Sequence, residues 1–327
     1  MISELSAEPF LRVKGLTVEY NTSEGAARAV NDVSLDLRKG ETLGIVGESG
    51  SGKTTLGLAL MGILPPQARR TKGSVVFGPD ELTALKDDRL RSIRGKRIAM
   101  IFQDPMTSLN PVKKIGDHFV EYILAHEPGT TRKEALSTTA KVLRGLGISE
   151  ERLNDYPHQF SGGMRQRVMI GLALVLNPDL IIADEPTTAL DVIVEAQILE
   201  LLKELKRAYS LSLILITHNM GVVAETADRV AVMYAGKLAE IGPALEIFTS
   251  PKHPYTQALL QSIPTVEGER RTLRVIPGFP PRLTEQPPGC SFHPRCPYAF
   301  ERCRTEDPLL VPTSAQGMAA CHLLAKK

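Results

Sequence analysis

The chain has 327 residues, of which 43% are hydrophobic, and its formal net charge is +2. This length suffices for one substantial α/β domain and an appendage, and the near-neutral charge with scattered lysine and arginine gives no reason to expect nucleic acid as a partner. The first residues lack a signal-peptide pattern and no apolar run is long enough to cross a bilayer, so we expect a cytosolic chain.

The predicted elements alternate between strands and helices along most of the chain. Residues 10–20 alternate like a strand, and a second strand-like run at 41–47 is followed by a helix-like segment at 53–64. A helix-rich stretch at 116–146 interrupts this pattern. It resumes with a strand at 179–183, a helix at 193–209 and a strand at 212–217. The order predicts one α/β domain that contains a helical insertion.

Proline becomes frequent after residue 250, which predicts a linker and then a loop-rich module. We therefore expect a first domain at residues 1–249, with a helical subdomain at about 104–165. A C-terminal extension at 250–327 contains all four cysteines.

The sequence GESGSGKT at residues 47–54 fits the phosphate-loop pattern and lies between a predicted strand and a predicted helix. Glycines allow backbone N–H groups to face phosphate oxygens, while Lys53 reaches the β- and γ-phosphates and the Thr54 hydroxyl ligates Mg²⁺. A glycine-rich turn without a ligand is the alternative. The predicted nucleotide-binding residues here are Gly47, Ser49, Gly50, Ser51, Gly52, Lys53, Thr54 and Thr55.

An apolar run at residues 180–183 ends in two carboxylates, Asp184 and Glu185. Such a run suits a buried parallel strand whose acids emerge at its carboxyl end. With a phosphate loop upstream, Asp184 is expected to hold Mg²⁺ and Glu185 to polarise water. A solvated strand end is the alternative.

Four further segments narrow the class: FQDP at residues 102–105, FSGGMRQR at 160–167, ALD at 189–191 and TH at 217–218. With these segments in this order over about residues 11–242, the chain resembles ATP-binding cassette (ABC) proteins. The resemblance implies a P-loop NTPase cassette with a RecA-like core, a helical subdomain and N-terminal antiparallel β strands. It also implies ATP and Mg²⁺ as cofactors.

Roles for the remaining residues follow from this resemblance. Glu185, His218 and Gln103 would be catalytic, and Gln103 would join Thr54 and Asp184 at Mg²⁺. Tyr20 resembles the aromatic residue that stacks on adenine, although a tyrosine packed at a strand end is the alternative.

Two such cassettes pack head to tail in the family. The resemblance therefore implies that Ser161, Gly162 and Gly163 face the nucleotide of the opposite subunit and that Asp191 tunes the subunit contact. Met164 stands where the family more generally has glutamine, a difference that the peptide-permease branch shares.

Three segments resemble the dipeptide, oligopeptide and nickel permease branch: DPMTSLNP at residues 104–111, HPYTQAL at 253–259 and the cysteine tail. This implies the ATP-hydrolysing subunit of a peptide importer at the cytoplasmic face of the inner membrane, with residues 104–111 as the link to a membrane subunit. A purely structural loop at residues 104–111 is the alternative, because asparagine-proline steps mark turns in any protein. The implied partners are a homologous or identical ATPase subunit, two integral-membrane permease subunits and an extracytoplasmic solute-binding protein. A nickel or other small-solute importer, a soluble non-transport ABC ATPase and a regulatory cassette that does not hydrolyse ATP are the alternatives.

The cysteines Cys290, Cys296, Cys303 and Cys321 have the spacing C-x₅-C-x₆-C-x₁₇-C. This differs from the C-x₂-C of common zinc ribbons, and the resemblance to the tail of peptide permeases favours a [4Fe-4S] cluster with a structural role. Zinc, with His293 or His322 completing the site, and metal-free thiols are the alternatives.

Overall fold

The computed structural model describes residues 9–103, 108–188, 190–262 and 276–324. Residues 104–107 of the predicted membrane-subunit link, Ala189 and residues 263–275 of the C-terminal extension lie outside the described residues. The chain divides into a first unit, residues 1–84 with 215–327, and a second unit, residues 85–214. Strand β8 (Ser212–Ile216) contains the boundary.

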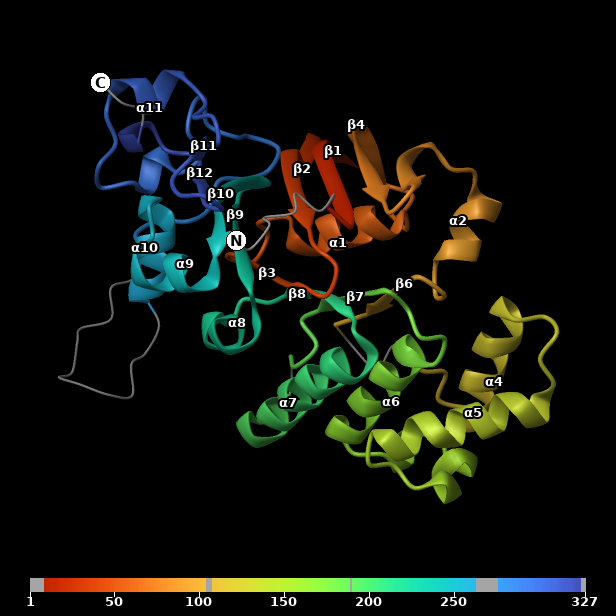
Figure 1. The fold of residues 1–327 in the computed structure, drawn as a ribbon. Helices are drawn as coiled ribbons and strands as arrows, with labels where there is room; N and C mark the ends of the chain where they lie inside the picture. Colours follow the sequence, from red (N-terminus) through yellow and green to blue (C-terminus); the bar gives the residue numbers. More distant parts are fainter. Residues whose placement is uncertain (1–8, 104–107, 189, 263–275, 325–327) are drawn as a thin grey trace, which may run out of the picture. The chain divides into compact units, whose positions relative to one another are not determined.

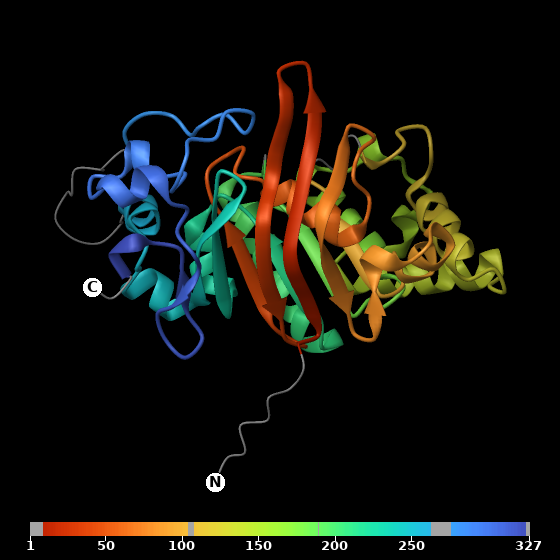
Figure 2. The same ribbon diagram turned by 90° about the horizontal axis from the view of Figure 1, so that it is seen from above.

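The N-terminal part of the first unit is an antiparallel sheet with the strand order β2-β1-β4-β5. Figure 2 shows β1 and β2 as two long neighbouring strands, drawn in red. At the start of β1 the buried side chains alternate, with Leu11 and Val13 buried, as expected for a sheet with one face on the core, whereas residues 16–18 are all buried. The strands are β1 (Leu11–Thr22), β2 (Gly25–Leu37), β4 (Ala68–Phe77) and β5 (Asp80–Glu81).

A second sheet of the first unit has the order β11-β12-β10-β9-β3. Strands β3 (Thr42–Val46) and β9 (Arg229–Tyr234) are parallel and buried along their whole length, which explains their continuous apolar sequences. Strand β10 (Lys237–Pro243) is antiparallel to β9 and also pairs with β12 (Met318–Ala319), which in turn pairs with β11 (Val311–Pro312).

Helix α1 (Lys53–Met61) follows β3 and ends at Gly62, whose left-handed backbone (φ 64°) caps the helix. The other helices of the first unit are α8 (Met220–Thr226), α9 (Ala244–Thr249), α10 (Pro254–Gln261), α11 (Glu301–Thr305) and the short 3-10 helices η1 (Leu82–Ala84), η4 (His293–Arg295) and η5 (His322–Leu324).

The C-terminal module, residues 250–327, shares a hydrophobic core with the second sheet. Tyr255 and Phe292 of the module are buried against Val46 at the end of β3 and Tyr234 at the end of β9. In Figure 1 the module lies beside β9, β10 and α9. The sheet therefore covers these two aromatic side chains, and the core of the module continues into that of the sheet.

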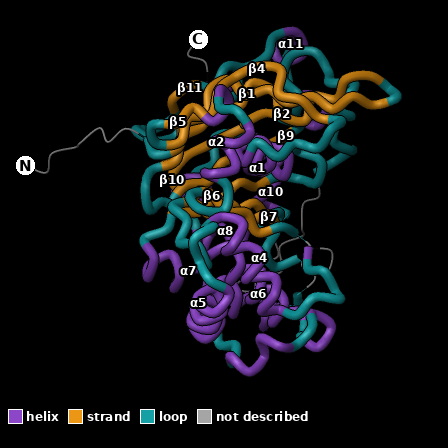
Figure 3. Tube along the Cα trace, turned by 90° about the vertical axis from the view of Figure 1, so that its right-hand side faces the viewer, coloured by secondary structure: helices purple, strands orange, loops and turns teal. Residues whose placement is uncertain are grey.

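The second unit contains two parallel strands, β6 (Ile98–Ile101) and β7 (Leu180–Asp184), and most of the long helices. Helices α4, α5 and α6 pack on one another, as Figure 3 shows. The helices are α2 (Asp87–Ile93), α4 (Ile115–His126), α5 (Arg132–Gly145), α6 (Gly162–Leu174), α7 (Val192–Tyr209) and the 3-10 helices η2 (Glu150–Asn154) and η3 (Pro157–Gln159). Among the described residues, no helix combines the length and apolar character needed to span a membrane.

Candidate nucleotide site

The phosphate loop connects the end of β3 to the start of α1, and two of its glycines are required by the backbone. Gly47 has φ 153° and Gly52 has φ 98°. A Cβ atom would lie 2.2 Å from the carbonyl oxygen of Met233 at Gly47, and 1.9 Å from that of Ala29 at Gly52. No residue with a side chain fits either position without moving the neighbouring strand or turn.

Lys53 follows the glycines of the loop and is only 6% exposed. Its Nζ donates hydrogen bonds to the carbonyl oxygens of Gly47 (2.8 Å) and Glu48 (2.9 Å) and to Oγ of Ser51 (3.4 Å). Helix α1 begins at Lys53 with no side-chain cap at Gly52. A buried ammonium group and a helix N-terminus are the groups that bind a polyphosphate, so these residues fit a nucleotide.

The other predicted residues of this unit lie near the loop in the fold. The hydroxyl groups of Tyr20 and Thr55 are 3.3 Å apart, which places β1 against α1. His218 is exposed and follows Thr217, whose backbone N–H donates to Ile45 of β3 at 3.1 Å. His218 therefore leaves the sheet at the edge where the phosphate loop begins. Ser49, Gly50 and Thr54 are exposed on the loop.

In the second unit, the two carboxylates follow one another at the end of β7. Asp184 is 2% exposed and Glu185 has an unusual left-handed backbone (φ 46°). Oε2 of Glu185 accepts hydrogen bonds from Oγ1 of Thr188 (2.7 Å) and Nε2 of Gln103 (3.5 Å). Carboxylate and amide oxygens are ligands that Mg²⁺ prefers, so Asp184 and Gln103 fit that ion.

Gln103 reaches Glu185 because of the strand register. Ile101 of β6 pairs with Ala183 of β7. Gln103 lies two positions after Ile101, and Glu185 lies two positions after Ala183. Both polar residues therefore emerge at the carboxyl edge of the parallel pair, as expected from the sequence pattern.

The segment around Ser161 forms the start of α6. Oγ of Ser161 accepts a hydrogen bond from the backbone N–H of Met164 at 3.3 Å, and so caps the helix. Gly162 is the first residue of α6. A Cβ atom at Gly163 would lie 2.5 Å from Cγ1 of Val194, so only glycine allows α7 to approach this closely.

Asp191 caps the neighbouring helix α7. Its Oδ1 accepts hydrogen bonds from the backbone N–H groups of Ile193 (3.1 Å) and Val194 (3.0 Å). Val194 also contacts the Gly163 position, so the two capped helix starts are packed together. Asp191 thus has a local structural task, and its effect on a subunit contact stays a prediction.

The predicted residues fall into two groups. Tyr20, the loop residues 47–55 and His218 belong to the first unit, whereas Gln103, Ser161, Gly162, Gly163, Asp184, Glu185 and Asp191 belong to the second. The structure brings Gln103 to Glu185, and it brings the Ser161 segment to α7. Of the three predicted Mg²⁺ ligands, Thr54 belongs to the first unit and Gln103 and Asp184 belong to the second. Their joint binding of Mg²⁺ stays a prediction.

The expected [4Fe-4S] site is wrong. Among the residues that the structure describes, no group of three or more Cys, His, Asp or Glu side chains could hold a metal ion, which also removes the zinc alternative. The four cysteines are free thiols. Burial raises the pKa of the Cys290 thiol to about 11 and also raises those of Cys296 and Cys321. In the metal-free chain these three thiols are therefore protonated near neutral pH.

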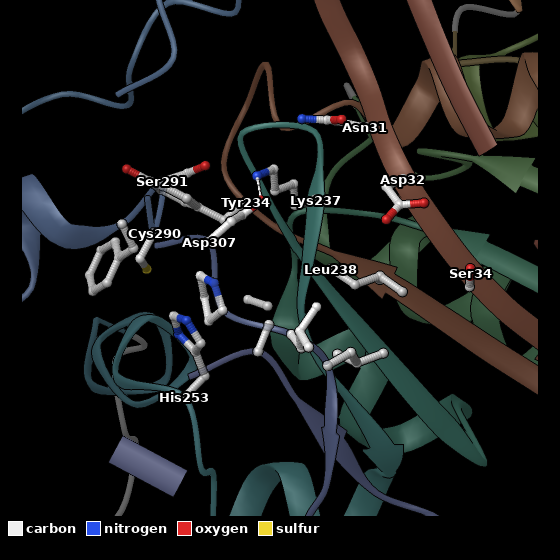
Figure 4. Close-up of a pocket in the computed structure, with 16 residues that line it drawn as sticks. Asn31, Asp32, Ser34, Tyr234, Lys237, Leu238, His253, Cys290, Ser291 and Asp307 are labelled. Atoms are coloured by element: carbon white, nitrogen blue, oxygen red, sulfur yellow. Dashed lines mark hydrogen bonds and ion pairs between the residues drawn. The ribbon is translucent and has the colours of Figure 1, made fainter. Parts of the chain in front are cut away.

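A cavity lies between the C-terminal module and strands β2, β9 and β10 of the same unit, separate from the phosphate loop. Its volume is about 240 Å³, and its walls include Tyr234, His253 and Cys290, as Figure 4 shows. Lys237 and Asp307 line it as an ion pair, so their charges neutralise each other. Burial lowers the pKa of His253 to about 4, which keeps its imidazole neutral near pH 7.

One contact of the phosphate loop has no signal in the sequence. Glu48, inside the phosphate loop, forms an ion pair with Arg295 of the C-terminal module. The backbone N–H of Glu48 also donates to the hydroxyl of Tyr255. Nothing in the local sequence pattern links residues that lie 247 positions apart, so only the fold reveals these contacts.

Comparison with known proteins supports this architecture. A family model described as ABC transporter matches residues 30–188, and one described as oligopeptide/dipeptide transporter, C-terminal region, matches residues 239–303. The chain is 52% identical to the dipeptide transport ATP-binding protein DppD of Bacillus subtilis, over 90% of this chain and 89% of that protein. It is 47% identical to the oligopeptide transport ATP-binding protein OppD of Escherichia coli, over 94% of this chain and 91% of that protein.

A solved structure shows the same fold. The dimeric post-hydrolysis state of the ATP-binding cassette MJ0796, bound to ADP and Pi, has a TM-score of 0.64 and 28% identity, and the match covers 72% of this chain and 98% of that chain. The predicted cassette fold, with its N-terminal antiparallel sheet, is confirmed. The chain belongs to the ABC transporter family of ATP-binding proteins, and it carries the C-terminal region of the oligopeptide/dipeptide transporters.

Proposed function

We propose that this chain is the ATP-hydrolysing subunit of an importer that moves dipeptides and oligopeptides across the cell membrane. The observation that carries the proposal is one chain that matches both the ABC transporter model and the C-terminal region of the oligopeptide/dipeptide transporters. Relatives at 47% to 52% identity are named as dipeptide and oligopeptide transport ATP-binding proteins, which supports the same substrate class.

In this proposal, each motif of the cassette has one task in hydrolysis. Lys53 binds the β- and γ-phosphates, and Thr54 and Asp184 would hold Mg²⁺, which would neutralise the charge that develops on those phosphates. Glu185 orients the attacking water and accepts its proton, while the bond from Thr188 fixes the carboxylate. Gln103 positions the same water, and His218 contacts the γ-phosphate.

The proposal includes a second ATPase subunit, identical or homologous. Two large apolar side chains at the start of α7, Val192 and Ile193, are 80% and 72% exposed beside the helix cap Asp191. Exposed neighbouring apolar residues often mark an interaction surface, which supports pairing here. A related cassette is described as dimeric in its solved structure.

The remaining partners follow from the importer class. They are two integral-membrane permease subunits and an extracytoplasmic solute-binding protein, with this chain bound peripherally at the cytoplasmic face of the membrane. ATP binding would close the two paired ATPase subunits on each other, and this movement would then be transmitted to the permease subunits.

Cellular uptake tests this proposal. In the native host, uptake of a labelled dipeptide, a longer peptide and nickel is compared between the wild type and Glu185→Gln, which removes the charged general base. Loss of peptide uptake alone supports the proposal. Loss of nickel uptake alone would assign the chain to nickel import, and unchanged uptake of all three solutes would contradict an importer of these solutes.

A further inference from the structure

The C-terminal module contacts the phosphate loop through a bidentate ion pair between Arg295 and Glu48. Nη1 of Arg295 donates to Oε2 of Glu48 at 2.7 Å, and Nη2 donates to Oε1 at 3.1 Å. The Arg295 side chain is 5% exposed and that of Glu48 is 27% exposed, so solvent screens the pair only in part. Two parallel charge-assisted bonds fix direction as well as distance.

Arg295 is itself held in place by other groups of the first unit. Its Nε donates to the carbonyl oxygen of Pro277 (2.8 Å), its Nη2 donates to that of Ile276 (3.4 Å) and its Nη1 lies 3.3 Å from the Tyr234 hydroxyl. The guanidinium also lies 5.8 Å from the centre of the Tyr234 ring. Arg295 therefore presents a pre-oriented fork to Glu48.

A second contact holds the backbone of the same loop residue. The hydroxyl of Tyr255 accepts a 2.9 Å hydrogen bond from the backbone N–H of Glu48. Tyr255 is fully buried, and its ring packs 4.6 Å from that of Tyr234 and 5.4 Å from that of Phe292, measured between centroids. The module thus fixes both the side chain and the main chain of Glu48.

Glu48 in turn contacts the residue that binds phosphate. Its carbonyl oxygen accepts from Nζ of Lys53 (2.9 Å) and from the backbone N–H of Ser51 (3.2 Å). A shift of Glu48 would therefore move the loop carbonyl that orients the Lys53 ammonium group. Loops that bind phosphate depend on such preorganised geometry.

We propose that Arg295 and Tyr255 are positioning residues for the ATP site, through which the C-terminal module sets the conformation of the phosphate loop. The proposal rests on the ATP hydrolysis described above. The ATPase activity of the wild type tests that hydrolysis. The ratio of the KM for ATP of each variant to that of the wild type tests the positioning.

The first experiment measures kcat and KM for ATP on the assembled transporter with Arg295→Met, Glu48→Gln and the double variant. Each single variant removes the ion pair, so the KM should rise about five- to fiftyfold, as expected for charge-assisted bonds. The double variant should be no worse than the more impaired single variant, because both changes act through one pair.

Glu48→Gln and one further variant, Tyr255→Phe, separate positioning from stability. Glu48→Gln keeps a side-chain oxygen that accepts from Arg295, and Arg295 keeps its bonds to Tyr234, Ile276 and Pro277, so the module should lose less melting temperature than in Arg295→Met while the KM still rises. Tyr255→Phe removes only the hydroxyl, and the KM should rise roughly threefold to tenfold.

Arg302→Met is the matched control. It breaks an ion pair with Glu306 in the same module, and the two side chains of this pair are 50% and 58% exposed. The kcat and KM for ATP should therefore not change. Wild-type KM in Glu48→Gln, or additive effects in the double variant, would overturn the proposal and leave the contacts with a structural role only.

Discussion

The hydroxyl of Thr188 donates a 2.7 Å hydrogen bond to Oε2 of Glu185, three residues earlier in the chain. Glu185 has a left-handed backbone (φ 46°), and Gln103 contacts the same carboxylate oxygen from β6 at 3.5 Å. Strained backbone at a proposed general base is held only where surrounding contacts fix it. The Thr188 bond is the shorter of these contacts, so it should control where the carboxylate points.

Replacement of Thr188 by valine keeps the shape of the side chain and removes its hydroxyl. We expect kcat for ATP hydrolysis to fall about five- to thirtyfold with little change in KM, because the carboxylate loses its orientation but the phosphate loop is untouched. Steady-state ATPase assays on the assembled transporter check this. Thr188→Ser, which keeps the hydroxyl, is the control, and equal kcat in all three proteins would show that the bond has no catalytic effect.

Substitutions of three glycines by alanine should separate steric clash from backbone strain. Gly52→Ala places a Cβ atom 1.9 Å from a carbonyl oxygen at φ 98°, whereas Gly50→Ala meets no atom within 4 Å at φ 77°. We expect losses in the free energy of unfolding of about 3 kcal/mol or more for Gly52→Ala and about 1 kcal/mol for Gly50→Ala.

Urea unfolding measures these losses. Gly129→Ala is the control, because it meets no atom within 4 Å and its φ lies outside the left-handed range. It should unfold within about 0.5 kcal/mol of the wild type. Equal losses for Gly52→Ala and Gly50→Ala would contradict the steric argument.

His253 should make stability depend on pH. Burial lowers its pKa to about 4, against 6.5 in the unfolded chain. Between these values the unfolded state binds more protons, so stability is fully present above pH 6.5 and falls as the pH drops towards 4, by up to about 3 kcal/mol. Urea unfolding at pH 7.5 and pH 5.0 measures the change.

His253→Asn provides the comparison for this pH effect. Nδ1 of His253 accepts a bond from the backbone N–H of Tyr255 at 3.0 Å and caps α10, and an asparagine oxygen can take over that bond. The variant should lose less stability than the wild type over the same pH interval. An identical pH dependence would show that other groups cause it.

The cysteine module should be stable without metal. Treatment with a chelator should leave its melting temperature unchanged. Burial raises the pKa of Cys290 to about 11 from 9.0, so its alkylation by iodoacetamide at pH 7.5 should be about a hundredfold slower in the folded than in the urea-unfolded protein. Mass spectrometry of the labelled peptide measures the rates, and a marked fall in stability with chelator would contradict the metal-free module.

The sequence predicts those parts of the site whose signal is local. The strand, the glycine loop and the following helix are contiguous, so the position of Lys53 was predictable from residue types alone. The helix was expected to extend to residue 64, but it ends at Met61 because Gly62 adopts a left-handed conformation. Gln103 and Glu185 were each recognisable in the sequence, but their contact depends on the register of β6 and β7, which the sequence does not show.

Other features depend on contacts that no local pattern contains. Strand β2 is hard to recognise because Asp32, with φ 56°, interrupts the alternation of its apolar residues. The interpretation of the cysteine tail as an iron-sulfur site rested on spacing and resemblance, and neither reports side-chain geometry or burial. The contact of Arg295 with Glu48 depends on how the whole first unit folds.

The pairing of β12 with β10 has a consequence for synthesis of the protein. Met318 pairs with Ile241, and Ala319 pairs with Glu240, so β10 has an uncovered edge until the ribosome has made the whole C-terminal module. At bacterial-type translation rates this interval lasts roughly 4 to 15 s. An open strand edge of this kind invites pairing with other nascent chains, so a chaperone that shields β10 during these seconds should raise the yield of folded protein.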